Sequence, residues 1–450
     1  MILKLSALLI LLELCLSGTA QKPIVAGPML GHVELRTAKV WLQFADNIKE
    51  ATIHYRAGSA GKVLAKKVAL KGGEFNTCVV DITGLEPGTA YSYYLTAGTG
   101  KNFLDSGRFV TQEIWQYRKP PADFTFLAGS CSYFNQPPYD RPGTPYGGDS
   151  SIYVTMAGEK SKFMLWLGDN WYTRYPDYSS AWGLHERPSY DRKQRVLQPF
   201  LKSMSHYAIW DDHDYGPNDA DKSYVLKEAS REAFTKYWAN PTYGMQGQGI
   251  YSMFNYNDVD FFLLDDRWFR SSDRMKDTVD GKINENKKMF GGEQIEWLKN
   301  ALLYSNISSF TKFRVIVTGS QVLNTYSRFD ALKTFPVEYN ELLSFIESNK
   351  IKGVVFVTGD RHHSEVIRHD RKNAYTLYDV TVSPLTSQPA KTQGAEITNP
   401  FRIGKEIAEQ NYGRFTVSGE GKDRKLTVEF VGLKGNVLDK WSVLASDLTN

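Results

Sequence analysis

The sequence predicts an α/β domain preceded by a small all-β domain. Three observations lead to this fold class. Between about residues 22 and 115, short segments alternate apolar and polar residues, with turn residues between them. After about residue 120, apolar strands alternate with helical stretches. These later strands are almost continuously apolar, which is typical of a sheet covered on both faces.

The first 20 residues have the features of a secretory signal peptide. Lys4 precedes the apolar run LSALLILLELCL (5–16), and small residues follow at 17–20. The run is too short for a membrane span of about 20 residues, and no later stretch is apolar enough to cross a bilayer. We therefore predict a cleaved signal peptide over 1–20, with a retained anchor as the alternative. The mature protein is expected to be periplasmic or secreted, without a transmembrane segment.

The next segment, residues 21–115, is predicted to be a β-sandwich of the fibronectin or immunoglobulin type. In GLEPGTAY (84–91), Pro87 and Gly88 form a turn, and Tyr91 enters the next strand as in a tyrosine corner. Strands are expected at 38–44, 51–57, 76–82 and 90–98. Because this domain carries no cluster of reactive side chains, we interpret it as a scaffold or lid.

Residues 120–450 are predicted to form one larger α/β domain. The clearest helix is 223–238, and 293–303 is a second. Strands are expected at 124–129, 163–168, 206–211, 259–269, 313–319, 353–359, 412–418 and 425–431.

The overall charge is nearly balanced. With 54 basic and 50 acidic residues, the net charge is +4, which gives no electrostatic reason to expect nucleic-acid binding. After cleavage only Cys78 and Cys131 remain, and in an exported protein they could form a disulfide.

Four of the expected strands lead directly into side chains that bind metals. In an α/β sheet, ligands gather at the carboxyl ends of the strands. The crowded carboxylates of WDDHDYGPND (210–219) need compensating positive charge, which basic side chains or bound cations would supply. The residues after the strands at 124–129, 163–168, 206–211 and 353–359 are Cys131; Asp169 and Tyr172; Asp212 and His213; Asp360, His362 and His363. The sequence therefore predicts a metal site at one edge of the sheet.

Each of these motifs has a simpler explanation when it is taken alone. Asp169 could cap a turn or a helix, and Arg267 could pair with Asp265 or Asp266. The two histidines could be one core and one surface residue. Only the coincidence at four strand ends favours a metal site over these alternatives.

In this order, the motifs GSC, GDxxY, WDDHD, LLDDR and TGDRHHSE resemble the PhoD-like (alkaline phosphatase D) metallophosphatases. The resemblance covers essentially the whole mature chain. It implies a calcineurin-like αββα sandwich, a multinuclear site with iron (Fe3+) and calcium (Ca2+), and hydrolysis of phosphoesters.

The resemblance also implies the ligands. The first metal would be bound by Cys131, Asp169, Tyr172 and His362, and Asp169 would bridge to a second metal held by Asp212, Asn218 and Asp360. Thiolate, phenolate and imidazole together suit iron, whereas carboxylates and an amide oxygen suit calcium; other divalent metals are an alternative. Against the wider metallophosphatase pattern, Gln321 lies where a histidine ligand is expected.

The expected reaction is attack of a metal-activated water on a phosphoester. His213 is predicted to stabilise the phosphoryl oxygens or to protonate the leaving alkoxide, and His363 and Arg267 are further candidates for holding phosphate. The sequence thus predicts an exported phosphomonoesterase. The alternatives are a phosphodiesterase or phospholipase D-type hydrolase, and a non-catalytic exported binding protein.

Two long, aromatic, turn-rich segments at 132–150 and 170–191 are expected to be loops that shape the substrate pocket. Their rings could contact a small-molecule or lipid phosphoester, with anionic groups bound by Arg141, Arg174 and Arg187. Alternatively, the rings only pack these loops onto the domain. We expect a monomer.

Overall fold

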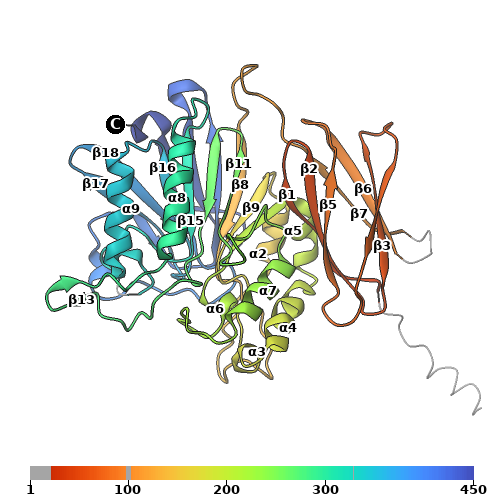
Figure 1. Ribbon diagram of the computed structural model, residues 1–450, viewed down its shortest axis with the longest axis horizontal. Helices are drawn as coiled ribbons and strands as arrows, with labels where there is room; N and C mark the ends of the chain where they lie inside the picture. The colour runs from red at the N-terminus through yellow and green to blue at the C-terminus, as the bar shows by residue number, and fades with distance from the viewer. Residues whose placement is uncertain (1–21, 98–102, 328, 450) are drawn as a thin grey trace, which may run out of the picture.

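Two β-sheets packed face to face, with helices on their outer faces, form the body of the protein (Figure 1). The computed structural model describes residues 22–97, 103–327 and 329–449, so the predicted signal peptide lies outside the described residues. No helix in these ranges is long and apolar enough to span a membrane. The predicted αββα architecture is confirmed.

The first sheet has nine strands in the order β22-β21-β20-β8-β9-β10-β1-β2-β5. Its central strands β8, β9 and β10 are parallel, and almost every residue in them is buried, which explains their continuous apolar sequence. The strands are β22 (Val437–Leu444), β21 (Lys425–Gly432), β20 (Asn411–Ser418), β8 (Phe124–Gly129), β9 (Phe163–Leu167), β10 (Ser205–Ile209), β1 (Ile24–Val33), β2 (Thr37–Phe44) and β5 (Thr77–Thr83).

The second sheet has seven strands in the order β11-β12-β15-β16-β18-β17-β19, with helices α8 and α9 over its outer face (Figure 1). Its elements are β11 (Ser252–Tyr256), β12 (Val259–Leu263), β15 (Phe313–Thr318), β16 (Val354–Thr358), β18 (Ala374–Thr381), β17 (Ser364–Arg371), β19 (Arg402–Ile407), α8 (Gly291–Asn306) and α9 (Pro336–Ser348). A hairpin of β13 (Thr278–Val279) and β14 (Lys282–Ile283) stands apart from both sheets.

The remaining helices cluster beside the nine-stranded sheet (Figure 1). They are α2 (Ile152–Ala157), α3 (Tyr175–Tyr178), α4 (Ala181–Arg192), α5 (Leu197–Ser203), α6 (Asp212–Tyr215) and α7 (Lys227–Tyr237). The expectation of a loop over 170–191 is wrong from residue 181 onward, because α4 occupies that part. Ser180 caps this helix by accepting a hydrogen bond from the backbone N–H of Gly183 at 3.0 Å. Pro188 lies inside the helix.

The amino-terminal β-sandwich forms as expected. A four-stranded sheet, β4 (Leu64–Ala69), β3 (Glu50–Ala57), β6 (Ala90–Ala97) and β7 (Phe103–Val110), packs against β1, β2 and β5 around one apolar core. The predicted tyrosine corner is confirmed, since the backbone N–H of Glu86 donates to the Tyr91 hydroxyl at 2.8 Å.

The β-sandwich and the larger domain share one continuous sheet. Strand β1 runs parallel to β10, with Leu30 opposite Ser205. Strand β1, which contains Gly27-Pro28, was not among the expected strands. This shared sheet fixes the β-sandwich against the domain that carries the candidate site.

Candidate metal centre

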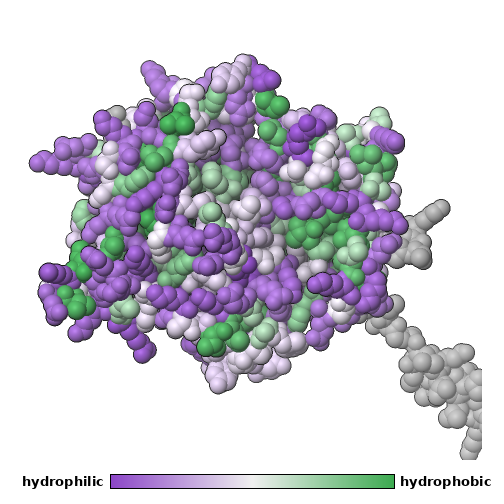
Figure 2. Space-filling model, in the orientation of Figure 1, coloured by the Kyte–Doolittle hydropathy of each residue, from purple (hydrophilic) through white to green (hydrophobic). Residues whose placement is uncertain are grey.

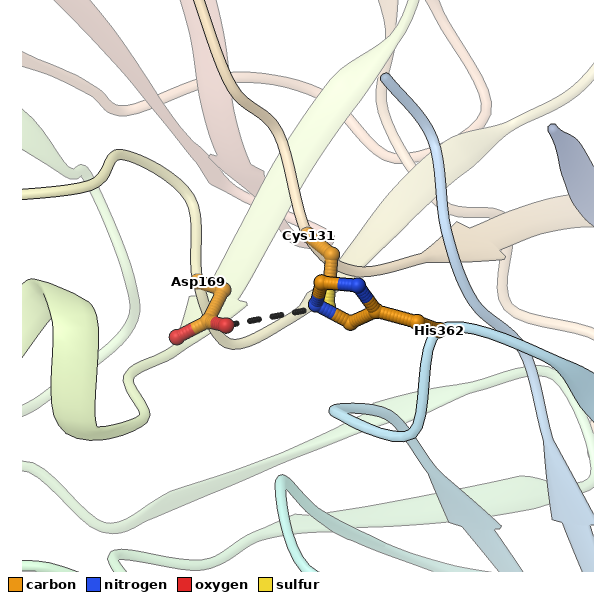
Figure 3. Close-up of side chains that lie close together, drawn as sticks. All are labelled: Cys131, Asp169 and His362. Carbon is orange, nitrogen blue, oxygen red and sulfur yellow. Dashed lines mark hydrogen bonds between the residues drawn. The ribbon is translucent and has the colours of Figure 1, made fainter. Parts of the chain in front are cut away.

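The predicted ligands meet at one edge of the two sheets. Strands β8, β9 and β10 of the first sheet and β16 of the second each end just before one of these residues. Possible ligand atoms of Cys131, Asp169 and His362 lie within 4.8 Å of one another, although the residues follow three different strands (Figure 3). The four strand ends therefore converge as the sequence predicted.

This group shares a residue with a second group of possible ligands, and the second shares a residue with a third. Asp169, Asp212 and His213 form the second group, and Asp211, Asp212 and Asp360 form the third. Asp169 belongs to the first two groups and Asp212 to the last two. The arrangement is consistent with two adjacent metal sites that share Asp169.

Four residues at this edge have a left-handed backbone conformation. Cys131, Asp169, Asp360 and His362 have φ values of 61°, 51°, 65° and 57°. Asp and His adopt positive φ more readily than most residues, whereas at Cys131 this conformation costs roughly 1–3 kcal/mol. The strain at Cys131 is consistent with a functional constraint on the position of its side chain.

The orientation of His362 leaves one ring nitrogen directed at the site. Its Nδ1 lies 2.7 Å from the carbonyl oxygen of Gln388, so Nδ1–H donates there and Nε2 is free to bind a metal. Nε2 lies 3.1 Å from the Tyr172 hydroxyl. The Cys131 thiol donates to Asp169 Oδ2 at 3.6 Å. These four residues are the predicted ligands of the first metal.

The buried acidic groups crowd one another. Burial, together with Cys131 and Asp212, raises the pKa of Asp169 well above its usual range. Burial, with Asp330 and Asp212, raises the pKa of Asp360 to about 8. Burial and the nearby Asp360 raise the pKa of the Cys131 thiol to about 12. Bound cations would relieve this repulsion, so the donor set fits metal ions.

His213 lies beside the predicted ligands. Its ring centroid is 4.2 Å from that of Tyr172, and its backbone N–H donates to Asp212 Oδ1 at 3.0 Å. Unlike Asp169, His213 is only half-buried. It is therefore the predicted catalytic residue that is best placed to contact a substrate.

Arg267 is completely buried behind the site. Its Nε donates to Asp211 Oδ1 at 2.5 Å, and its Nη2 lies 3.3 Å from Asp330 Oδ1. The proposed pairing with Asp265 or Asp266 is not its main contact, since Asp266 lies 3.9 Å away. Arg267 therefore orients Asp211 and is screened from bulk solvent.

Two other predicted residues lie apart from the ligand groups. His363 is buried, with Nε2 3.4 Å from Glu365 Oε1 on β17. Asn218 is exposed, and it is the backbone N–H of its neighbour Asp219 that donates to Asp212, at 2.7 Å. Gln321, at the position where a histidine ligand was expected, donates through Nε2 to Glu365 at 2.9 Å.

Arginines within the aromatic segments form hydrogen bonds and ion pairs with aspartates of these segments. Arg174 donates to Asp140 at 2.9 Å, and Arg187 donates to Asp177 at 2.8 Å. Both side chains are buried, so the expectation that they bind anionic groups of a substrate is wrong. Arg141, in contrast, is exposed.

Tyr146, in the segment 132–150, was not among the predicted site residues. Its hydroxyl is 3.3 Å from His362 Nδ1, and its ring contacts the ring of Tyr172. Many tyrosines occupy this segment, and nothing in their spacing marks this one.

The disulfide alternative is wrong, because Cys78 lies on β5 and both cysteines are free.

Comparison with known proteins agrees with this geometry. The sequence profile of the PhoD-like phosphatases matches residues 126–415. The chain belongs to the PhoD-like phosphatase family. Residues 21–108 match a domain of unknown function (DUF7800).

One curated relative is alkaline phosphatase D of Bacillus subtilis (strain 168), which is 25% identical over 350 residues. The match covers 66% of this chain and 56% of the relative, so it spans a little over half of that protein's length.

Two solved structures share the fold. The structure of PhoD superimposes with a TM-score of 0.79 at 18% identity and covers 96% of this chain and 92% of that chain. Purple acid phosphatase PPD1 from yellow lupin (Lupinus luteus) seeds has a TM-score of 0.66 at 11% identity and covers 93% and 74%. The predicted metallophosphatase fold is thereby confirmed.

Proposed function

We propose that this protein is an exported metal-dependent phosphoester hydrolase, and specifically a phosphomonoesterase of the alkaline phosphatase D type. The observation that carries the proposal is the position of Asp169 at the common edge of the two sheets, where it lies near Cys131 and His362 of the first predicted metal set and near Asp212 of the second. Membership of the PhoD-like phosphatase family supports the reaction class. Export is proposed from the signal-like residues 1–20 alone.

The proposed metals are Fe3+ and Ca2+. Cys131, Tyr172 and His362 would hold iron, since thiolate, phenolate and imidazole suit a strongly Lewis-acidic ion. Asp212 and Asp360 would supply oxygen ligands to calcium. When bound, the metals would polarise phosphate oxygens and lower the pKa of a water molecule, which is then the nucleophile.

The side chains of the protein would supply the rest of the chemistry. His213 would donate a proton from its ring to the leaving alkoxide or a hydrogen bond to a phosphoryl oxygen. Arg267 would act as a positioning residue, because its contact with Asp211 fixes the start of α6, which carries Asp212 and His213. His363 would have no direct part, given its burial against Glu365.

A phosphodiesterase or phospholipase D-type hydrolase is the second candidate. The observation that favours it is the exposure of Tyr139 and Tyr175, 51% and 76%, in the two aromatic segments, together with the exposed Arg141. These side chains could contact the second ester arm of a diester.

The test is kcat/KM for p-nitrophenyl phosphate and for bis-p-nitrophenyl phosphate on one iron- and calcium-loaded preparation. A strong preference for the monoester supports the phosphomonoesterase. A preference for the diester moves the conclusion to the second candidate. No turnover of either substrate with both metals bound contradicts the proposed function.

A further inference from the structure

The outer face of the four-stranded sheet in the β-sandwich carries two arginines in one row. Arg56 on β3 and Arg108 on β7 both pair in register with Ser92 on β6. Residues directly opposite each other on antiparallel strands point to the same face, so the two arginines flank Ser92 with backbones about 10 Å apart. Both side chains are exposed.

An aromatic pair lies on the same face, two positions along β3 and β6. His54 and Tyr94 are opposite each other, and their rings stack at 4.5 Å with an interplanar angle of 9°. Tyr94 is 38% exposed. The rings and both arginines line a shallow cavity of about 520 Å³.

A second cavity, of about 780 Å³, lies next to the first, between the β-sandwich and the larger domain. It shares Arg56, Ser92 and Arg108 with the first cavity and adds Lys162. Phe124, Phe163 and Ser205, the first residues of β8, β9 and β10, also line it. The metal ligands follow the opposite, carboxyl ends of these strands. The cavity is therefore remote from the candidate active site.

The combined surface has an excess of unpaired positive charge. Within the described ranges, no ion pair involves Arg56, Arg108 or Lys162. The acidic side chains of the larger cavity are already paired: Glu113 with Lys119 at 2.8 Å and Asp123 with Arg424 at 2.8 Å. The surface is complementary to an anionic ligand.

We propose that this basic strip, made of Arg56, Arg108, Lys162, His54 and Tyr94, binds an acidic polysaccharide. Guanidinium groups bind carboxylates and sulfates through paired hydrogen bonds. A partly exposed aromatic ring supplies an apolar platform for a sugar ring. A strip that continues from one open cavity into another fits an extended polymer. Binding there would hold the protein on the polymer and leave the metal centre uncovered, whatever reaction the centre catalyses.

The experiment measures the affinity of the purified protein for heparin at physiological ionic strength. Arg56→Ala/Arg108→Ala should weaken binding by at least about tenfold, because the variant loses two sites for charge-assisted hydrogen bonds. The control, Lys66→Ala/Lys71→Ala, removes the same charge from the same domain away from this face and should change affinity less than about twofold. Thermal unfolding of each variant checks that the fold is intact.

Two further variants separate sugar recognition from general attraction to anions. Arg56→Lys/Arg108→Lys keeps the charge but loses the guanidinium fork, and it should also weaken heparin binding. Tyr94→Ala should weaken binding to heparin but not to polyphosphate.

An equal loss of heparin affinity in Arg56→Ala/Arg108→Ala and in the control Lys66→Ala/Lys71→Ala would overturn the proposal. The absence of heparin binding by the wild-type protein would also overturn it. Binding of polyphosphate or anionic lipid vesicles as tightly as heparin, with no effect of Tyr94→Ala, would assign the strip to another polyanion and refute the polysaccharide.

Discussion

Two buried polar clusters lie close together in this protein, and they differ in charge. The first is the metal cluster defined by Cys131, Asp169, Tyr172, Asp212, Asp360 and His362. The second, here called the glutamate network, consists of Gln321, Asn324, Arg361, Glu365, Glu396 and Arg402. In the network, Arg402 contacts Glu365 at 2.7 Å and Arg361 contacts Glu396 at 3.0 Å, so two carboxylates meet two guanidinium groups.

In the metal cluster, burial is outweighed only at Asp212, where His213 and Arg267 lower the pKa; Asp169 and Asp360 have no such balance. Burial and neighbouring negative groups raise the pKa values of Asp169 and Asp360, whereas His363 and Arg402 outweigh burial and lower the pKa of Glu365 to about 2. Both clusters are buried and rich in hydrogen bonds. Burial therefore does not mark a functional site here; unbalanced charge does.

Asp169→Asn gives the largest expected effect. Without the shared carboxylate, neither predicted metal set is complete, so kcat/KM should fall by at least about a thousandfold and bound metal should be lost. Activity assays and metal analysis of the purified variant check this. A variant that keeps both metals would contradict the bridging role.

The same variant tests the charge imbalance. At pH 7 the raised pKa of Asp169 makes the folded, metal-free state bind a proton that the unfolded state does not, which costs stability. Metal-free Asp169→Asn should therefore unfold at the same temperature as the metal-free wild type or higher. A clearly lower unfolding temperature would show that Asp169 is needed for folding itself.

Glu365→Gln should act in the opposite way, on stability and not on metal. The pKa of Glu365 is lowered from 4.5 to about 2, so the stabilisation is fully present above about pH 4.5 and is lost as pH falls toward 2. Loss of the charge should cost about 3 kcal/mol of unfolding free energy at pH 7. Urea unfolding between pH 2 and 7 should show a shallower acid dependence in the variant, and its metal content should match that of the wild type.

His213→Ala tests a residue at the edge of the metal cluster. We expect kcat to fall by about 100-fold while both metals stay bound, because the variant loses a proton or hydrogen-bond donor and no predicted ligand. His369→Ala, on the second sheet outside the cluster, is the matched control and should leave kcat unchanged. Unchanged kcat in His213→Ala removes this residue from the mechanism.

Arg361→Lys gives the smallest effect and tests the connection between the two clusters. Arg361 lies between Asp360 and His362 in sequence, and its guanidinium binds Gln321 and Glu396. A lysine keeps the charge but cannot form both contacts, so metal affinity should fall by about tenfold through misplacement of the two ligands. Metal titration monitored by calorimetry measures this. An unchanged affinity would mean that the network does not position the metal cluster.

The sequence predicted much of the fold and the convergence at the metal cluster, because apolar strands and the residues that follow them are local features. Tertiary context decided the rest. Strand β1 contains Gly27-Pro28 and forms only because β2 and β10 pair with it. The burial of Arg174 and Arg187 could not be predicted, since their partners Asp140 and Asp177 are brought to them by folding.

The distribution of surface hydropathy also depends on tertiary context. Figure 2 shows predominantly hydrophilic side chains over the larger domain and an apolar patch over the β-sandwich, and composition alone does not distinguish these regions.

The roles of His363 and Gln321 also depended on Glu365, a residue that the motifs did not highlight.

The central claim is that the unbalanced metal cluster is the catalytic centre. The most direct measurement is kcat/KM for p-nitrophenyl phosphate on one preparation as purified, after chelation of its metals, and after iron and calcium are restored. The account predicts a loss of at least about a thousandfold on chelation and recovery on restoration. Full activity after verified removal of the metals would contradict it.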